Sequence, residues 1–397
     1  MPRRPEIGPP DLRTEEQPLR ELLEHPEATG DRRSWARVSH LGLGSSRVVR
    51  ATGAKGVLHG ALTMLPMAQY FGGRHVPVMA LAGLGVAPQA PPDKPGQLLR
   101  QVLVEAQSQG FAAACVQPIR QGPWRDAGFE QAGARYRVRV QPDAVHLADH
   151  TLPIQRILAS HMGAVIACYQ RHAQALNGHF VRHPWCWHTI QNPANTDNPV
   201  QTYLISGDRG VEGYIYMVQR ESVDRRTTLE VTDMAALTAE AGRRILTLLS
   251  DNTSLADEIC WYGSPSDGIC MLLPERTFSI TIDNYWFIRI VDVAAALTRR
   301  GYPRGVAAEL HLHIDDPIIA GNSGRKVLRV LDGRGTLENG AGRGSLQVTP
   351  RGLAALFTGH RAPTTLRAAG LIDGTDDELA LAQTVFGGSD PWHPDVL

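Results

Sequence analysis

A long apolar stretch near the start of the chain constrains the fold more than any other feature. Residues 76–88 read VPVMALAGLGVAP and carry no charged side chain, which is typical of a β-strand buried on both faces. Residues 89–95 hold three prolines and can continue neither a strand nor a helix. From Gly96 the apolar residues recur at helical spacing, and the pattern stops near Gly110. The stretch therefore predicts a buried strand, a turn and an amphipathic helix.

A strand that feeds a helix through a tight turn often binds an anion. The first turn of the helix presents unpaired N–H groups and the positive end of the helix dipole. Many α/β proteins contain the same unit without a ligand, so a phosphate-binding role and a purely structural role both stay open.

Length and charge limit the class of protein. A chain of 397 residues is long enough for two or three domains, each with its own core. The 40 basic and 40 acidic side chains cancel, so no overall field directs the chain to nucleic acid or to an anionic membrane. No apolar run is long enough to cross a bilayer, and the N-terminus lacks an apolar signal core. We expect neither a nucleic-acid partner nor a membrane partner.

The cysteines and histidines give no metal-binding pattern. Five scattered cysteines without a CxxC pair indicate reduced thiols in a cytoplasmic protein rather than a disulfide framework or a zinc site. They are Cys115, Cys168, Cys186, Cys260 and Cys270. The pairs His183 and His188, and His311 and His313, lack further ligands at metal-site spacing, so packing roles are favoured and no metal is expected.

The chain is predicted to contain three units after a loose, Arg-, Glu- and Pro-rich segment at 1–34. Residues 35–149 form the first unit, with the strand, turn and helix described above at its centre. Residues 150–280 repeat its order of three strands and a helix, and begin with a helical pattern over 154–174. Residues 281–397 form the third unit, in which strands and short helices alternate.

The chain ends in an unusual tail. Residues 385–397 read VFGGSDPWHPDVL, whereas most chain ends are polar and loose. A tail that ends in Val-Leu after a tryptophan is predicted to be docked.

This order of units resembles the Eis-type N-acetyltransferases, named for enhanced intracellular survival. The resemblance runs from about Arg47 to the end of the chain, some nine-tenths of its length. The matching segments are AGLGVAP (82–88), YQRHAQALNGHFVRHPWCWH (169–188), GYIYMV (213–218), NYWFIRIVDVAAALTRRGY (284–302), VLRVLDGRG (327–335) and FTGHRAPTTLRAAGLI (357–372). The resemblance implies an α+β protein with two GNAT-like domains in tandem, followed by a domain similar to sterol carrier protein 2. It also implies a homo-oligomer, because the family forms hexamers.

The resemblance implies a function as well. A member of this family transfers an acyl group, most often acetyl, from acyl-CoA to a primary amine of a small, antibiotic-like molecule. Backbone groups of Leu84 and Val86 would pair with the pantetheine arm of acetyl-CoA. The residues that would hold its pyrophosphate are Lys94, Gly96, Gln97 and Leu98. The terminal carboxylate, here that of Leu397, is the implied general base.

Two positions depart from the family pattern. The family turn is Arg/Gln-x-x-Gly-x-Gly/Ala, whereas this chain reads DKPGQL. Asp93 replaces the leading residue, Pro95 removes an N–H group and only Lys94 supplies positive charge. The family's general-acid tyrosine falls on Trp124 in GPWRDAGF, and an indole cannot transfer a proton near neutral pH.

Arg125 and Asp126 follow Trp124 directly and are candidates to replace the missing acid. Candidate substrate-binding residues are Trp35, Arg125 and Asp395. Two hypotheses follow. The first is an acyl-CoA-dependent N-acyltransferase. The second is a GNAT-fold relative with a degenerate CoA site, recruited to another reaction of specialised metabolism or to ligand binding alone.

Overall fold

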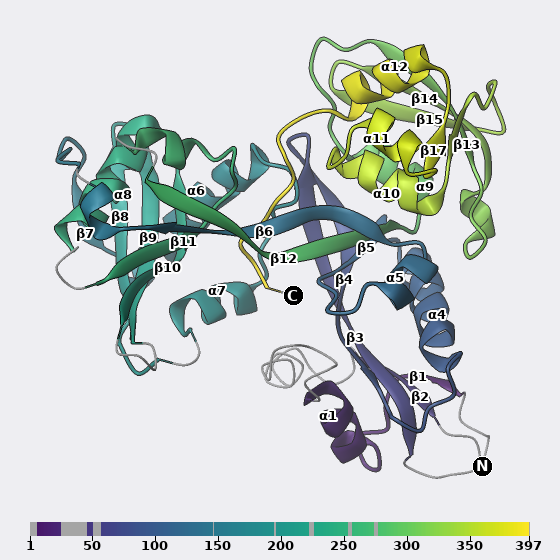
Figure 1. Cartoon of the computed structure of the whole chain (residues 1–397), viewed down its shortest axis with the longest axis horizontal. Helices are drawn as coiled ribbons and strands as arrows, with labels where there is room; N and C mark the ends of the chain where they lie inside the picture. Colours follow the sequence, from purple (N-terminus) through teal and green to yellow (C-terminus); the bar gives the residue numbers. More distant parts are fainter. Residues whose placement is uncertain are drawn as a thin grey trace. The chain divides into compact units, whose positions relative to one another are not determined.

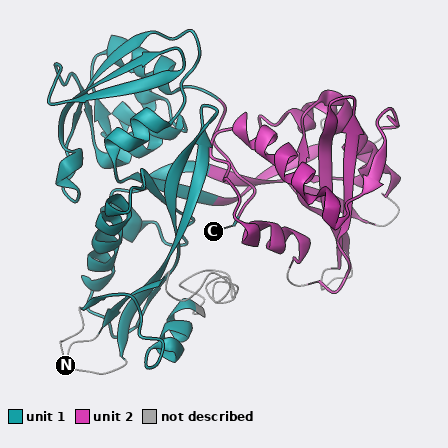
Figure 2. Cartoon of the chain, turned by 180° about the vertical axis from the view of Figure 1, so that it is seen from behind, with its two compact units in different colours: residues 1–133, 285–388, 396–397 teal, residues 134–284, 389–395 magenta. Residues whose placement is uncertain are grey.

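The computed structural model describes residues 6–24, 46–50, 57–145, 147–193, 196–221, 226–252, 256–273 and 277–396 (Figure 1). The chain divides into two compact units, shown in Figure 2. Unit 1 comprises residues 1–133, 285–388 and 396–397, and unit 2 comprises residues 134–284 and 389–395. The domain boundaries expected from the sequence stay predictions.

Unit 1 begins with a mixed sheet whose hydrogen-bonded strand order is β1-β2-β3-β4-β5-β12. Its strands are β1 (Ile7–Gly8), β2 (Ser46–Arg50), β3 (Leu58–Phe71), β4 (Arg74–Val86), β5 (Ala113–Val116) and the end of β12 (Phe278–Ile290). The helices of this part are α1 (Glu16–Glu24), α4 (Lys94–Ser108) and α5 (Gly122–Asp126). The predicted strand, turn and helix are β4, the segment 87–93 and α4, so β4 and β5 run parallel with α4 as their crossover.

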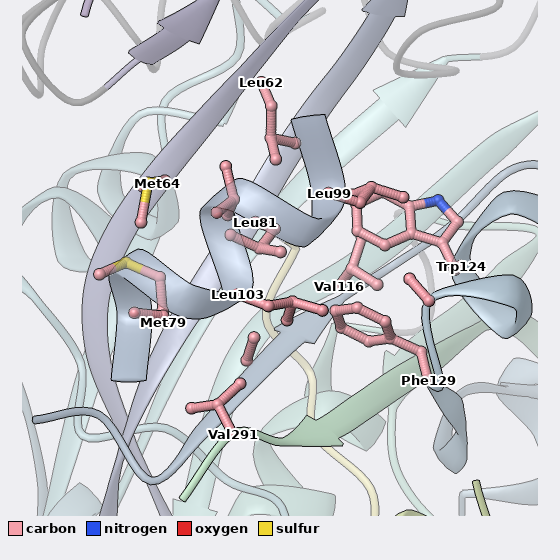
Figure 3. Close-up of a cluster of buried hydrophobic side chains, with 14 of the residues drawn as sticks. Leu62, Met64, Met79, Leu81, Leu99, Leu103, Val116, Trp124, Phe129 and Val291 are labelled. Carbon is pink, nitrogen blue, oxygen red and sulfur yellow. The ribbon is translucent and has the colours of Figure 1, made fainter. Parts of the chain in front are cut away.

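Helices cover both faces of this sheet. The apolar side of α4 supplies the centre of the main core, in which Leu99 and Leu103 point towards Leu81, Trp124 and Phe129 (Figure 3). The helix α1 packs in a separate cluster. Its buried members are Leu19, Leu23, Val48, Leu58 and Ala61.

Unit 2 repeats this arrangement in the strand order β6-β11-β10-β9-β8-β7. Its strands are β6 (Glu130–Val140, shared with unit 1), β7 (Ile154–Arg156), β8 (Gln201–Gly207), β9 (Gly210–Glu221), β10 (Thr227–Ala236) and β11 (Glu258–Tyr262). Its helices are α6 (Met162–Gln174), α7 (Pro184–Gln191) and α8 (Ala239–Asp251). Here β10 and β11 are the parallel pair and α8 is their crossover. The predicted helix over 154–174 begins only at Met162, because 154–156 pairs with β8 as a strand.

Each sheet is completed by a strand that crosses from one unit to the other. In unit 1 the residues 287–290 of β12 pair antiparallel with β5. In unit 2 the residues 137–140 of β6 pair antiparallel with β11. The repeat predicted from the order of strands and helices is therefore present at the level of strand pairing.

The last part of unit 1 is a second sheet of order β15-β14-β13-β16-β17, with short helices beside it. Its strands are β13 (Ala308–Ile314), β14 (Gly324–Leu331), β15 (Arg334–Asn339), β16 (Leu346–Val348) and β17 (Ile372–Asp373). Its helices are α9 (Val293–Arg299), α10 (Pro350–Thr358), α11 (Pro363–Ala368) and α12 (Asp376–Phe386). None of the helices described in the chain is long and apolar enough to cross a bilayer.

The turn between β3 and β4 packs directly on the backbone after α9. The N–H of Gly301 donates to the carbonyl of Phe71 at 2.9 Å. A Cβ on Gly301 would lie 1.9 Å from the carbonyl oxygen of Gly72, which is backbone and cannot move aside. Gly301→Ala is expected to lower the free energy of unfolding by about 3 kcal/mol, the cost of overpacking a rigid contact. Thermal unfolding would measure the loss.

The control is Gly321→Ala, because a Cβ there meets no atom within 4 Å. It should leave the melting temperature unchanged. Equal melting temperatures for the two variants would show that the contact of Gly72 and Gly301 has no energetic weight.

Candidate acyl-CoA site

The strands β4 and β5 separate part-way along their length. Their last paired residues are Leu81 and Val116, yet β4 continues for five more residues to Val86. Directly beyond the last pair, Gly83 has a φ of 64° and forms a bulge, since two residues of β4 stand opposite Leu62 alone. Glycine permits this left-handed conformation without steric strain. The bulge directs the end of β4 away from its parallel neighbour.

The separated end of β4 presents peptide groups to whatever lies beside it. Within the described chain, residues 82–86 have no strand partner on the side of β5. Leu84 is half-buried and Val86 is 42% exposed. An unpaired strand edge binds extended ligands that carry amides, because it satisfies their donors and acceptors in sequence. The pantetheine arm of coenzyme A has this chemistry, so the residues present fit that part of the cofactor.

The first turn of α4 offers fewer donors to an anion. The N–H of Lys94 donates to Pro91, the N–H of Gln97 donates to Asp93, and Pro95 has none. The amide of Gly96 makes no hydrogen bond to any described residue, so it is the amide of this turn that can donate to a phosphate. Leu98 is fully buried in the core and contributes through packing. The cradle is present but reduced.

The single lysine of the turn is engaged. Lys94 forms an ion pair with Glu6, and its Nζ also lies 3.2 Å from Oε1 of Gln97. The hydrogen bond to Glu6 raises the pKa of Lys94, so the ammonium stays charged. A pyrophosphate would have to compete with Glu6 for this cation.

This competition predicts the effect of Glu6→Gln. Removing the carboxylate frees Lys94 for a phosphate, so the dissociation constant for CoA should fall by a factor of about 2–5, the usual range for one exposed charge pair. The control is Glu16→Gln, which removes an exposed carboxylate on α1. Calorimetric titration would detect the difference. Unchanged or weaker binding by Glu6→Gln would show that Lys94 does not face the phosphates.

The position of the family's general acid lies in the core. Trp124 on α5 is 4% exposed, and its ring packs edge-on against Phe129 at 5.2 Å (Figure 3). Asp126, two residues on, is exposed. The indole therefore supports the wall of the site, and its catalytic assignment and that of Asp126 stay predictions.

Arg125 belongs to a charge cluster. Its guanidinium donates to Oε1 of Glu130 at 3.1 Å, while Arg351 on α10 donates to Oε2 at 2.8 Å and 2.5 Å. Burial on its own would raise the pKa of Glu130, but the Gln131 amide and the two arginines outweigh it and lower that pKa. The carboxylate is therefore ionised, and Arg125 is already paired before any substrate binds.

The remaining predicted site residues lie elsewhere. Trp35 and Leu397 fall outside the described residues. Asp395 lies in unit 2, where its Oδ1 accepts a hydrogen bond from Nε of Arg182 at 2.9 Å. A substrate-binding role for Asp395 stays a prediction.

Arg182 is a residue that sequence reasoning missed. Its guanidinium is 1% exposed and donates to both oxygens of Asp233, at 2.7 Å and 2.8 Å. It also lies 3.8 Å above the ring of Tyr169. Burial would lower the pKa of Arg182, but Asp233 and Asp395 outweigh it and raise that pKa. Its only signal in the sequence was the basic residue of HFVRHP, whose acidic partners lie far along the chain.

The histidine pairs pack as the sequence indicated. His183 accepts the N–H of Trp185 at the start of α7, and Nε2 of His311 lies 3.0 Å from Glu309. Among the described residues no three His, Cys, Asp or Glu side chains gather as a metal site.

Comparison with known proteins gives the family. The model of the GNAT acetyltransferase domain matches residues 178–290, and the model of the sterol carrier protein domain matches residues 293–394. No curated protein matches the chain.

Three solved structures match along the whole chain. A GCN5-related N-acetyltransferase from Anabaena variabilis ATCC 29413 is 30% identical with a TM-score of 0.91, and the match covers 98% of this chain and 99% of that one. One from Kribbella flavida is 26% identical with a TM-score of 0.83 and the same coverage. Eis1 from Mycobacterium abscessus is 21% identical with a TM-score of 0.80, covers 99% of this chain and 100% of that one, and shares the fold. The chain therefore belongs to the GCN5-related N-acetyltransferases, with two such domains in tandem and a sterol carrier protein domain at the C-terminal end.

Proposed function

We propose that the protein is an acyl-CoA-dependent N-acyltransferase that acts on a primary amine of a small, antibiotic-like molecule. Family membership supports acyl-CoA as the donor and an amine as the acceptor in general terms. The observation that carries the proposal is the separated end of β4, where a bulge at Gly83 leaves the peptide groups of residues 82–86 without a strand partner towards β5.

Each part of the site has a task in this proposal. The backbone of Leu84 and Val86 binds the amides of the pantetheine arm. The Gly96 amide and the first turn of α4, including Gln97 and Leu98, hold the pyrophosphate, with Lys94 as the cation. When bound, the acyl-CoA supplies the acyl group as a thioester.

The chain's own residues would manage the protons. The amine nitrogen bonds to the acyl carbon as the carbon–sulfur bond breaks, and the carboxylate of Leu397 takes the proton that the nitrogen loses. A proton must also reach the leaving sulfur. Asp126 is exposed and can relay one from solvent, whereas buried Trp124 can donate only a hydrogen bond. Trp35 and Arg125 would contact the acceptor.

The setting follows from the same family and from the cysteines. All five cysteines are buried and none forms a disulfide. Reduced thiols are typical of a cytoplasmic protein, and the family resemblance favours a homo-oligomer such as a hexamer. We include both in the proposal.

The direct test is acetyl transfer by the purified full-length chain. Free CoA thiol would be followed in the presence of acetyl-CoA and a panel of primary amines that includes amino sugars, polyamines and peptide amines. We expect thiol release that depends on an amine and on enzyme. Release from no member of the panel, in a chain that binds acetyl-CoA, would contradict the proposed acceptor class.

A second candidate is a relative that has lost acyl transfer and binds a small metabolite. The pairing of Lys94 with Glu6 and the burial of Trp124 favour it. The two candidates differ in acetyl-CoA binding: the second predicts none.

A further inference from the structure

The two sheets open at the same place, but the proposed mechanism uses only one opening. In unit 2, β10 pairs with β11 over residues 228–230 and then continues to Ala236 without it. A bulge at Thr232 follows the last pair, as the bulge at Gly83 does in β4. Unit 2 thus has a separated strand end in the position that the cofactor is proposed to take in unit 1.

The C-terminal segment, residues 389–395, lies at this second opening. Trp392 and Pro394 line a small pocket together with Asp233 of β10 and Trp261 of β11. Trp392 is 4% exposed, and its ring packs edge-on against His179 at 4.6 Å. The segment therefore covers the place where β10 and β11 separate.

Backbone contacts hold the same segment along its length. The N–H of Trp392 donates to the carbonyl of Asn177 at 3.0 Å, and the side-chain amide of Asn177 donates to the carbonyl of Ser389 at 3.0 Å. Nε of Arg135 donates to the carbonyl of Pro394 at 2.8 Å. His393 is fully buried against Phe180, with ring centres 4.9 Å apart.

One buried arginine joins the segment to the opening. Asp233 is the residue directly after the bulge at Thr232, and Arg182 binds it with two hydrogen bonds. The same guanidinium binds Asp395, and Tyr214 donates to Asp233 at 2.7 Å. A planar guanidinium can hold both carboxylates at once, which a lysine cannot.

We propose that the opening between β10 and β11 is a receptor for the chain's own C-terminal segment, and that Arg182 is the positioning residue that fixes the segment through Asp395. The second acetyltransferase-like domain then holds the chain end and does not bind a second acyl-CoA. The consequence for catalysis rests on the proposed function, in which the terminal carboxylate is the base.

The length of free chain gives the size of the effect. Two residues follow Asp395, so the terminal residue lies within about 7 Å of it. If the segment detaches, the free chain grows to the nine residues 389–397. The local concentration of the carboxylate then falls roughly tenfold, since it scales as about the −3/2 power of length.

The test is Asp395→Asn, which keeps the shape and removes the charge. We expect faster hydrogen exchange of the backbone amides of 389–396. We also expect kcat for acetyl transfer to fall roughly tenfold while KM for acetyl-CoA stays unchanged. Asp395→Glu keeps a carboxylate for Arg182 and should restore part of both losses. Asp390→Asn removes an exposed carboxylate from the same segment and should change neither.

The outcomes separate this proposal from the proposed function. Unchanged exchange in Asp395→Asn would overturn the anchor, and faster exchange with unchanged kcat would overturn the positioning role. Two acetyl-CoA sites per chain would overturn the receptor role of unit 2. A wild-type chain without acetyl transfer would remove the proposed function, and the exchange measurement would still decide the anchor.

Discussion

Removing Val396 and Leu397 is expected to lower kcat for acetyl transfer by a factor of about 100 or more. The truncation moves the terminal carboxylate back to Asp395, away from the place that the proposed base occupies. A general base contributes roughly 10²–10⁴-fold to a rate. The melting temperature should change by only a few degrees, because the buried anchors Trp392 and His393 remain. Steady-state kinetics and thermal unfolding of the same preparation would measure both.

Two further variants separate the carboxylate from the side chain. Leu397→Ala keeps the carboxylate in place and should retain most of the activity. A chain extended by one glycine moves the carboxylate outward by one residue and should lose activity as the truncation does. Full activity in the truncated chain would remove the terminal carboxylate from the mechanism.

Asp316→Ala is expected to be among the most destabilising substitutions in unit 1. Asp316 and Arg289 are each 1% exposed, and Nη2 of Arg289 donates to Oδ1 of Asp316 at 2.6 Å. The same carboxylate accepts from the amides of Ile318 and Ile319 and from the side chain of Asn322. Removing it leaves a buried guanidinium without its counter-charge, which costs about 3–5 kcal/mol. Denaturant unfolding would measure the loss.

The neighbouring Asp315 supplies the control, because it is exposed. Asp315→Ala should change the unfolding free energy by less than about 0.5 kcal/mol. Similar losses in both variants would show that the pair with Arg289 carries no special weight.

The same pair predicts how stability depends on pH. Burial on its own would raise the pKa of Asp316, but Arg289 and the hydrogen bonds of Asn322 and Ile319 outweigh it and lower that pKa. The carboxylate therefore stabilises the fold above its unfolded pKa of about 3.9, and this contribution is lost as the pH falls through the lower native value. Asp316→Asn should be less stable near neutral pH and should lose less on acidification.

Local patterns in the sequence were enough for most of the fold. The uncharged run at 76–88 and the helical spacing after Gly96 gave β4 and α4, because burial on both faces and on one face leave different periodicities. The helix α12 was missed, although Thr375 and Glu378 form the capping box that marks its start. Helical periodicity over 154–174 was misleading in its first part, since pairing with β8 decides the conformation of 154–156.

The network around Arg182 could not be predicted in the same way. Asp233 lies 51 residues from Arg182 and Asp395 lies 213 residues from it, so no local pattern links them. The bulges at Gly83 and Thr232 are equally hidden, because they depend on the register between strands. What the sequence did reveal was the tail itself, whose tryptophan is out of place at a chain end.

The pairing of Lys94 with Glu6 also depends on contacts that sequence spacing does not reveal. The sequence showed one cation in the turn, and the structure shows that it already has a partner 88 residues away. Whether a pyrophosphate displaces Glu6 is therefore the question on which the account depends.

Calorimetric titration of the full-length chain with acetyl-CoA answers it most directly. The account predicts one site per chain with a dissociation constant in the micromolar range, because β4 binds the pantetheine arm and the C-terminal segment covers the second opening. No heat at millimolar acetyl-CoA would contradict the central claim that this is an acyl-CoA-dependent transferase.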